Sequence, residues 1–134
     1  MNINTTKYSK AIIGILSTLI MFHLAVMLEI LPMNIVWGGR LQDRNEMLIF
    51  ETIAITINAL IMLLVAMKAG IVKRRIPPRA LQISIWIIAF MFTTNIFTNL
   101  MAFHWFEKWV MGSVTVILSF LFIRLALTPK DEKA

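Results

Sequence analysis

The chain contains no cysteine and few charged residues. Of its 134 residues, 15% are charged and 59% are hydrophobic, and the mean hydropathy is +0.80. The absence of cysteine excludes disulfide frameworks and thiolate metal sites. A soluble domain of this length would carry about 25% charged residues, so the scarcity of charge indicates a membrane protein. The length is that of one domain, and we expect residues 1–134 to form a single integral membrane domain.

Polar intervals are also few, and they divide the sequence into four apolar runs. Runs of about 20 apolar residues are long enough to cross a bilayer as helices. The first run should end at Pro32, because the residue before a proline disfavours helix. It is longer than the apolar region of a secretory signal, so we expect it to be retained. The sequence therefore predicts an all-α membrane protein, a four-transmembrane-helix bundle with helices at about residues 11–31, 48–68, 80–103 and 110–127.

Lysine and arginine are distributed unevenly between the two sides that four spans define. Ten of the 13 lie in the N-terminal tail, around the connection between the second and third spans, or in the C-terminal region. Only Arg40, Arg44 and Lys108 lie on the other side. The positive-inside rule then predicts a protein of the cytoplasmic (inner) bacterial membrane with both termini in the cytoplasm. The basic run at residues 73–79 is explained by topology and by attraction to anionic lipid headgroups, so no nucleic-acid partner is expected.

The longest polar interval in the first half of the chain, residues 32–51, joins the first two spans. It contains the tetrapeptide WGGR, which begins at Trp37. The two glycines permit a tight turn whose backbone N–H groups can form an anion-binding concavity. Arg40 can form a two-pronged contact with a carboxylate or phosphate. The alternative is a re-entrant turn with an interfacial tryptophan.

Polar side chains within the predicted spans gather near this interval. Such residues usually face protein or water, because facing lipid is costly. At about 1.5 Å of rise per residue, the outer half of the spans holds six of them, and the inner half holds little beyond two serines and one threonine. We therefore expect a polar pocket that opens outward. The candidate ligand-binding residues are Glu29, Trp37, Arg40, Arg44, Glu51, Asn58, Asn95 and Asn99.

Individual polar residues leave alternatives open. A carboxylate one turn inside the bilayer should be paired or protonated, so Glu51 is either a ligand-facing or proton-handling group or a structural partner of Arg44. That pairing would be direct if the second helix began near Arg40. Glu29 is explained by solvation at the interface, and His23, on nearly the opposite side of its helix, by burial with a hydrogen bond.

Two further sets of residues have structural interpretations. The three asparagines can simply tie helices together. Gly112, Thr115 and Ser119 share one face of the fourth span, which predicts a close-packing stripe. We expect no metal, cofactor or catalytic site: His23, Glu29, Glu51 and His104 lack the tight spacing of a metal motif, and the chain shows no nucleophile with a base, phosphate loop or cofactor motif.

The run IVWGGRLQDRNEMLIFETIAITIN resembles small bacterial four-helix membrane proteins that share a WGGRL stretch followed by a helix beginning near a Phe-Glu pair. That resemblance implies no activity. The layout is also similar to the emopamil-binding-protein-like (EXPERA) domain, a group of four- or five-helix membrane proteins that bind sterols and amphiphilic amines. This similarity implies that Glu29 and Glu51 occupy the acidic positions of its first two helices, while Thr93-Thr94 and Phe106-Glu107 correspond to its third-helix features. The similarity is not taken to imply that this chain has an isomerase activity.

Three functions are consistent with the sequence. The leading hypothesis is a pocket that binds a small amphiphilic or lipid-like ligand, with Glu51 as counter-charge. The second is a small carrier or oligomeric channel. The third is a non-catalytic accessory or assembly subunit of a membrane complex that docks to a partner protein through the Gly112, Thr115 and Ser119 stripe and the face of His23. The chain could also form a homo-oligomer.

Overall fold

The computed structural model of the chain describes residues 3–128. Four long helices account for most of this range, and three short helical segments join or extend them. The long helices are long and apolar enough to cross a membrane, with η3 and α4 forming one span. The predicted all-α bundle of four transmembrane helices is confirmed. The elements are α1 (Ile3–Met27), η1 (Met33–Ile35), η2 (Trp37–Gly39), α2 (Arg44–Lys68), α3 (Pro78–Leu100), η3 (Phe106–Met111, a π-helix) and α4 (Gly112–Ala126).

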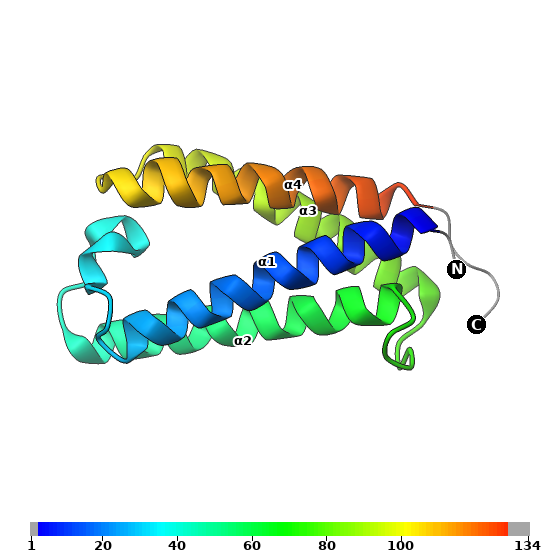
Figure 1. Ribbon diagram of the computed structural model, residues 1–134, viewed down its shortest axis with the longest axis horizontal. Coiled ribbons are helices and arrows are strands. Elements are labelled where there is room, and N and C mark those ends of the chain that lie inside the picture. The colour runs from blue at the N-terminus through cyan, green and yellow to red at the C-terminus, as the bar shows by residue number, and fades with distance from the viewer. Residues whose placement is uncertain (1–2, 129–134) are drawn as a thin grey trace.

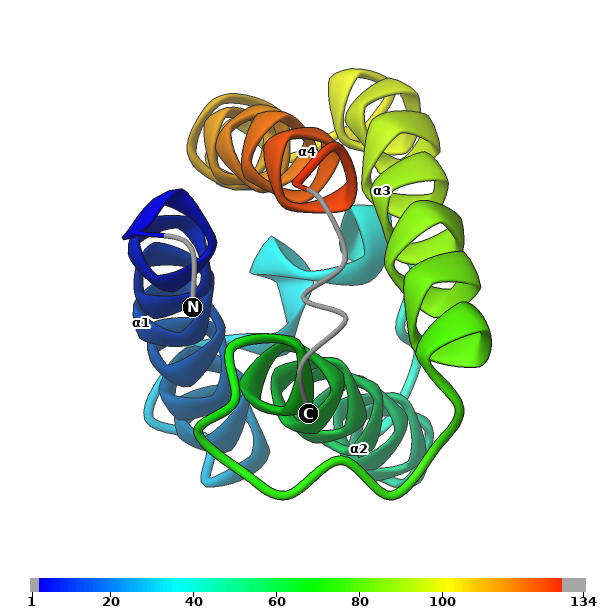
Figure 2. The same ribbon diagram turned by 90° about the vertical axis from the view of Figure 1, so that its right-hand side faces the viewer.

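The helices are arranged as two hairpins that diverge at one end. Helix α1 packs along α2 and α3 packs along α4, whereas α2 and α3 contact each other little. The hairpins lie close together where α1 begins and α4 ends, which we call the terminal end (Figure 1). At the opposite end, the loop end formed by residues 28–43 and 101–105, they separate and η1 and η2 lie between them. Viewed along the bundle, these short segments occupy the centre of the ring of helices (Figure 2).

Apolar packing closes the half of the bundle nearer the terminal end. A buried cluster draws side chains from all four long helices, and the rings of Phe92 and Phe122 stack at a centroid distance of 5.3 Å. Because lipid tails are as apolar as these side chains, close van der Waals packing holds the helices together here. The cluster includes Ile12, Leu16, Ile61, Val65, Ile85, Phe92, Leu118 and Phe122.

Polar contacts add to this closure at the terminal end. The Lys68 ammonium donates to Gln82 Oε1 at 2.8 Å, and Gln82 Nε2 donates to the carbonyl of Ala126 at 2.6 Å, so α2, α3 and α4 are joined. The Arg124 guanidinium donates to the Tyr8 hydroxyl at 3.1 Å and joins α4 to α1. The hairpins are therefore fixed at one end and free to diverge at the other.

Charge is divided between the two ends of the bundle. Among residues 3–128, every acidic side chain lies in the half that carries the loop end, namely Glu29, Asp43, Glu46, Glu51 and Glu107. The half that carries the terminal end holds only basic charged residues in that range, namely Lys7, Lys10, Lys68, Lys73, Arg74, Arg75, Arg79 and Arg124.

Helix α1 ends four residues before the predicted boundary at residue 31. The amide of Ile30 donates to the carbonyl of Ala25 at 2.9 Å, and Glu29 takes a left-handed conformation with φ of 60°. This is a common way to end a helix, although glycine is the usual residue at the left-handed position. Pro32 therefore does not set the boundary, and Glu29 lies outside the helix that was predicted to contain it.

Helix α1 begins at Ile3, eight residues before the predicted start, and the second and fourth spans each begin four residues early. Helix α2 begins at Arg44, neither at 48 nor near Arg40, because the Asp43 side chain accepts a hydrogen bond from the amide of Glu46 at 2.8 Å and caps the helix. An aspartate at this position satisfies one of the free N–H groups of the first turn. The fourth span begins at Phe106 instead of 110, so the connection from α3 is only residues 101–105.

The predicted close-packing stripe on the fourth span is confirmed. Gly112, Thr115 and Ser119 are buried in α4, which packs most closely with α3. Asn99 Nδ2 donates to the Thr115 hydroxyl at 3.2 Å, and the hydroxyls of Thr93 and Ser119 lie 2.7 Å apart. The stripe is therefore covered by α3 within the same chain, and this surface is closed to the partner that the accessory-subunit hypothesis assigned to it.

The two glycines at positions 39 and 14 give a matched stability test. Gly39 has φ of +70°, and a Cβ there would lie 3.2 Å from the carbonyl oxygen of Asn34. We expect Gly39→Ala to destabilise the protein by about 1–2 kcal/mol, whereas Gly14→Ala, whose Cβ meets nothing within 4 Å, should stabilise α1 by roughly 0.5–1 kcal/mol. Thermal unfolding in detergent measures both, and equal shifts would contradict the strained turn.

Candidate functional site

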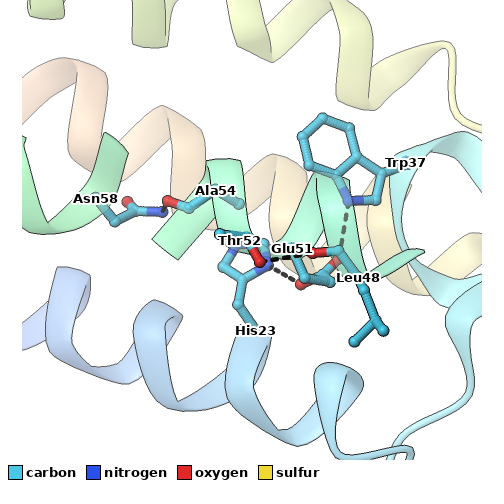
Figure 3. A network of polar contacts seen from close by, with 7 residues as sticks. All are labelled: His23, Trp37, Leu48, Glu51, Thr52, Ala54 and Asn58. Atoms are coloured by element: carbon cyan, nitrogen blue, oxygen red, sulfur yellow. Dashed lines mark hydrogen bonds and ion pairs between the residues drawn. The ribbon is translucent and has the colours of Figure 1, made fainter. Parts of the chain in front are cut away.

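A fully buried carboxylate lies where α1, η2 and α2 meet. Glu51 is 0% exposed. The Trp37 indole N–H donates to its Oε1 at 2.8 Å, and His23 Nδ1 lies 2.6 Å from its Oε2 (Figure 3). A buried carboxylate is stable only when its oxygens have such partners. The three side chains therefore form one hydrogen-bonded unit, which we call the Glu51 triad.

Local geometry brings the members of the triad together. His23 lies one turn before the end of α1, and Glu51 lies two turns after the start of α2, so the antiparallel hairpin places them at similar depth. Trp37 and Gly38 both have positive φ, of 55° and 71°. This left-handed pair turns the indole back toward α2, where it also contacts the ring of Phe50 at a centroid distance of 4.9 Å.

A second carboxylate holds the same turn from the other hairpin. The amide of Gly38 donates to Glu107 Oε2 at 2.5 Å. Glu107 belongs to η3, so η2 is bound to α2 through Trp37 and to the beginning of the fourth span through Gly38. The predicted anion-binding turn thus receives a carboxylate of the chain itself. Arg40 lies beside it, with its guanidinium over the ring of Phe103 at 5.9 Å.

A cavity of about 390 Å³ lies between the diverging hairpins, next to η2. Apolar side chains from all four helices form much of its wall. Cavities of this size with a mainly apolar wall and a few polar groups are typical of small-molecule sites. Its polar lining consists of His23, Trp37, Asn58, Thr94, Asn95, Thr98, Asn99, Glu107 and Thr115.

The structure brings together four of the eight predicted site residues, Trp37, Asn58, Asn95 and Asn99, in the wall of this cavity. Glu51 is not part of the wall, because the indole of Trp37 and the ring of His23 contact its carboxylate.

The other three predicted site residues, Glu29, Arg40 and Arg44, are exposed and lie outside the cavity lining. Arg44 Nε pairs with Glu29 Oε1 at 2.5 Å, with both side chains more than half exposed. Glu29 follows the end of α1 and reaches the first residue of α2, whereas Glu51 lies deeper and meets His23. The suggested Arg44–Glu51 pair is therefore absent, and Glu51 takes its partners from α1 and η2.

The three asparagines have different roles. Asn99 links α3 to α4 through Thr115, as expected of a residue that ties helices together. Asn58 Nδ2 donates to the carbonyl of Ala54 in its own helix at 2.9 Å, and Asn95 Oδ1 lies 2.6 Å from the hydroxyl of Thr98. In the described part of the chain, Asn58 and Asn95 thus form no hydrogen bond between helices.

Two side chains of the candidate site were not among the predicted site residues. His23 was interpreted as a buried, hydrogen-bonded histidine, but its partner could not be found while only residues of one helix were compared. Glu107 was noted only for the Phe-Glu pair that it forms with Phe106. Its position at the beginning of an apolar span, like that of Glu51, was the available signal.

In comparisons with protein-family models, curated proteins and solved structures, nothing matches the chain. Its class follows from the helices themselves. The chain is an integral membrane protein built as a bundle of four transmembrane helices.

Removing the Glu51 carboxylate tests the triad. Glu51→Ala leaves the indole N–H and the imidazole without their acceptor, and each unsatisfied buried group costs about 1–3 kcal/mol. We expect a large loss of thermal stability in detergent, and a smaller loss for Glu51→Gln, which retains a carbonyl oxygen for Trp37. Glu29→Ala is the control, because an exposed pair contributes only ~0–1 kcal/mol. Equal losses for Glu51→Ala and Glu29→Ala would contradict the triad.

Proposed function

We propose that this protein binds a small amphiphilic, lipid-like molecule in the cavity beside η2. The observation that supports this proposal is the cavity's mixed lining, which combines apolar side chains with several hydrogen-bonding ones. Side chains with hydrogen-bonding capacity come from every surrounding element, including His23 on α1, Trp37 on η2 and Glu107 on η3. If these groups had only a structural role, they would need only to form hydrogen bonds with one another.

The acidic side chain of the lining and the apolar cluster lie toward opposite ends of the cavity. Trp37 and Glu107 lie toward the loop end, where η2 crosses between the hairpins. Leu19, Ile61 and Phe92 lie toward the closed half and belong to the apolar cluster or pack against it. The headgroup of a ligand would therefore face the loop end, with its apolar part directed into the bundle.

The charges of the lining favour a headgroup that donates hydrogen bonds. Glu107 brings a carboxylate to the wall, and within residues 3–128 no lysine or arginine lines the cavity. In that range His23 is the only basic side chain of the lining, and its Nδ1 is already engaged by Glu51. An anionic headgroup would meet like charge, whereas an amine, amide or alcohol would meet an acceptor. The counter-charge role first considered for Glu51 is thus better suited to Glu107.

The closed half of the bundle favours binding over transport through one copy of the chain. The cluster that includes Leu16, Val65, Ile85 and Phe122 fills the space between all four helices, and each of these side chains is 0% exposed. Among residues 3–128, the buried hydroxyls of that half, such as those of Ser9 and Ser119, are isolated within this apolar packing, so ions and polar solutes would have no polar lining to replace their water.

The charge distribution supports an orientation for the site. The half of the bundle that carries the terminal end holds eight basic residues and no acidic residue among residues 3–128. We infer from the positive-inside rule that this end lies in the cytoplasm of a bacterial cell. The cavity, near the loop end, would then lie in the outer half of the inner membrane.

Binding is tested with three amphiphiles that share one alkyl chain and differ in headgroup: an amine, an alcohol and a phosphate. We expect the amine and the alcohol to raise the unfolding temperature of the purified protein and the phosphate to leave it unchanged. Glu107→Gln keeps an acceptor for Gly38 but removes the charge. It should weaken amine binding roughly tenfold, since a hydrogen bond to a charged group contributes about 1.5–3 kcal/mol, and leave alcohol binding nearly unchanged.

Glu46→Gln is the matched control. Glu46 lies in the first turn of α2 and outside the cavity lining, so this variant should behave as the wild type with all three amphiphiles. No shift with any headgroup, or equal shifts with all three in the wild type and in both variants, would contradict the proposal.

A further inference from the structure

The exposed part of the cavity wall belongs mainly to two helices. Ile57 on α2 is 43% exposed and Met91 on α3 is 38% exposed, and Thr94, Asn95 and Thr98 on α3 are also exposed. The lining side chains of α1, η3 and α4 are all buried or half-buried. The cavity therefore opens sideways, between α2 and α3.

The other sides are largely covered, although Trp37 of η2, at the loop end, is 37% exposed. On the side of α1 and the fourth span, the rings of Phe22 and Phe106 stack at a centroid distance of 5.7 Å. At the loop end, η2 is held by the carboxylates of Glu51 and Glu107, and at the terminal end the apolar cluster fills the bundle. Helices α2 and α3 contact each other little, because α3 runs from beside α2 at the terminal end toward α4 at the loop end (Figures 1 and 2).

This opening lies within the spans that can cross a membrane, Arg44–Lys68 and Pro78–Leu100. In a membrane it would therefore face lipid acyl chains. Asn95 is five residues from the end of α3, which corresponds to a depth of about 7–8 Å along the helix. A polar side chain at this depth is expected to face protein or a polar ligand, because exposure to lipid is costly.

The polar side chains at the edge of the opening have only some of the hydrogen-bond partners that they need. The hydroxyls of Thr94 and Thr98 donate to carbonyls of α3 itself, at 2.8 and 2.9 Å. Asn95 Oδ1 is beside the Thr98 hydroxyl, but the Asn95 side-chain nitrogen forms no hydrogen bond within residues 3–128. A membrane-dissolved molecule that passes between the helices would thus meet one free amide group at the entrance.

We propose that the gap between α2 and α3 is a lateral portal, framed by Ile57, Met91 and Asn95, through which the ligand enters from the bilayer. The inference rests on the proposed binding function and narrows the ligand to molecules that dissolve in the membrane, with a short hydrogen-bonding headgroup at the depth of Asn95 and an apolar body. Water-soluble solutes have no comparable route to the cavity.

The absence of cysteine allows a direct test of access that does not depend on any ligand. Val114→Cys places a single thiol on the α4 wall of the cavity. In proteoliposomes, dodecyl methanethiosulfonate dissolved in the bilayer should modify this thiol, as measured by mass spectrometry. The water-soluble trimethylammonioethyl methanethiosulfonate should modify it at least roughly tenfold more slowly than a thiol introduced by Gln42→Cys in the exposed loop.

Tryptophan substitutions at two isoleucines on α2 form a matched pair that tests whether blocking the portal slows modification of the thiol. Ile57→Trp, at the portal, should slow modification of the Val114→Cys thiol by the lipid-dissolved reagent about tenfold. Ile49→Trp should have no effect, because Ile49 is 59% exposed but lies outside the cavity lining. Met91→Trp narrows the portal from α3 and gives the same test if Ile57→Trp fails to fold, which gel filtration will show.

Equal rates in the Ile57→Trp and Ile49→Trp backgrounds, or rapid modification by the water-soluble reagent, would overturn the lateral portal. Neither result would bear on whether amphiphiles bind, because the thiol reports access to the cavity alone. Conversely, a confirmed portal without thermal shifts from the amphiphiles would refute the binding function and leave the opening in place.

Discussion

The buried carboxylate of Glu51 is the constraint on which the arrangement of the loop end depends. An isolated charge in an apolar bundle is unstable, and both of its oxygens take their partners from other elements, the imidazole of α1 and the indole of η2. The α1–α2 hairpin and the position of Trp37 are therefore determined by one group. Because Trp37 is followed directly by Gly38, the same turn also delivers a backbone N–H to Glu107 on the opposite hairpin.

The cavity follows from how the two hairpins are joined. At the terminal end, side chains of all four helices pack directly and exclude space between them. At the loop end, a short segment of irregular backbone is interposed, and its polar contacts keep α1–α2 and α3–α4 apart. Non-helical backbone is tolerated at such depth only where it is buried in protein or lines a cavity, and η2 does both.

The number, type and approximate position of the helices were predictable, because long apolar runs and the distribution of lysine and arginine are properties of single segments. The stripe of Gly112, Thr115 and Ser119 was predictable for the same reason, since all three residues lie on one helix. The helix ends were less accurate. The left-handed conformation of Glu29 ends α1 without a glycine, and the capping by Asp43 was not considered.

The site was predicted only in part, because its contacts join segments that are distant in sequence. Asn58, Asn95 and Asn99 could be placed near the correct depth by counting residues from the loop. The pairing of Glu51 with His23, of Gly38 with Glu107 and of Arg44 with Glu29 depends on how the hairpins pack and on a turn with two successive left-handed residues. Helical periodicity predicts neither the packing of the hairpins nor the conformation of this turn.

The separation of charge between the two ends of the bundle has a consequence for where a ligand can come from. Reversing the protein in the membrane would require at least eight basic side chains to cross the hydrocarbon layer, at a cost of about 2.5–3.5 kcal/mol for each at the centre of a helix. Each copy therefore keeps its loop end on one side for its lifetime. The proposed portal near that end would exchange molecules with a single leaflet, so the composition of that leaflet alone would determine which amphiphiles reach the cavity.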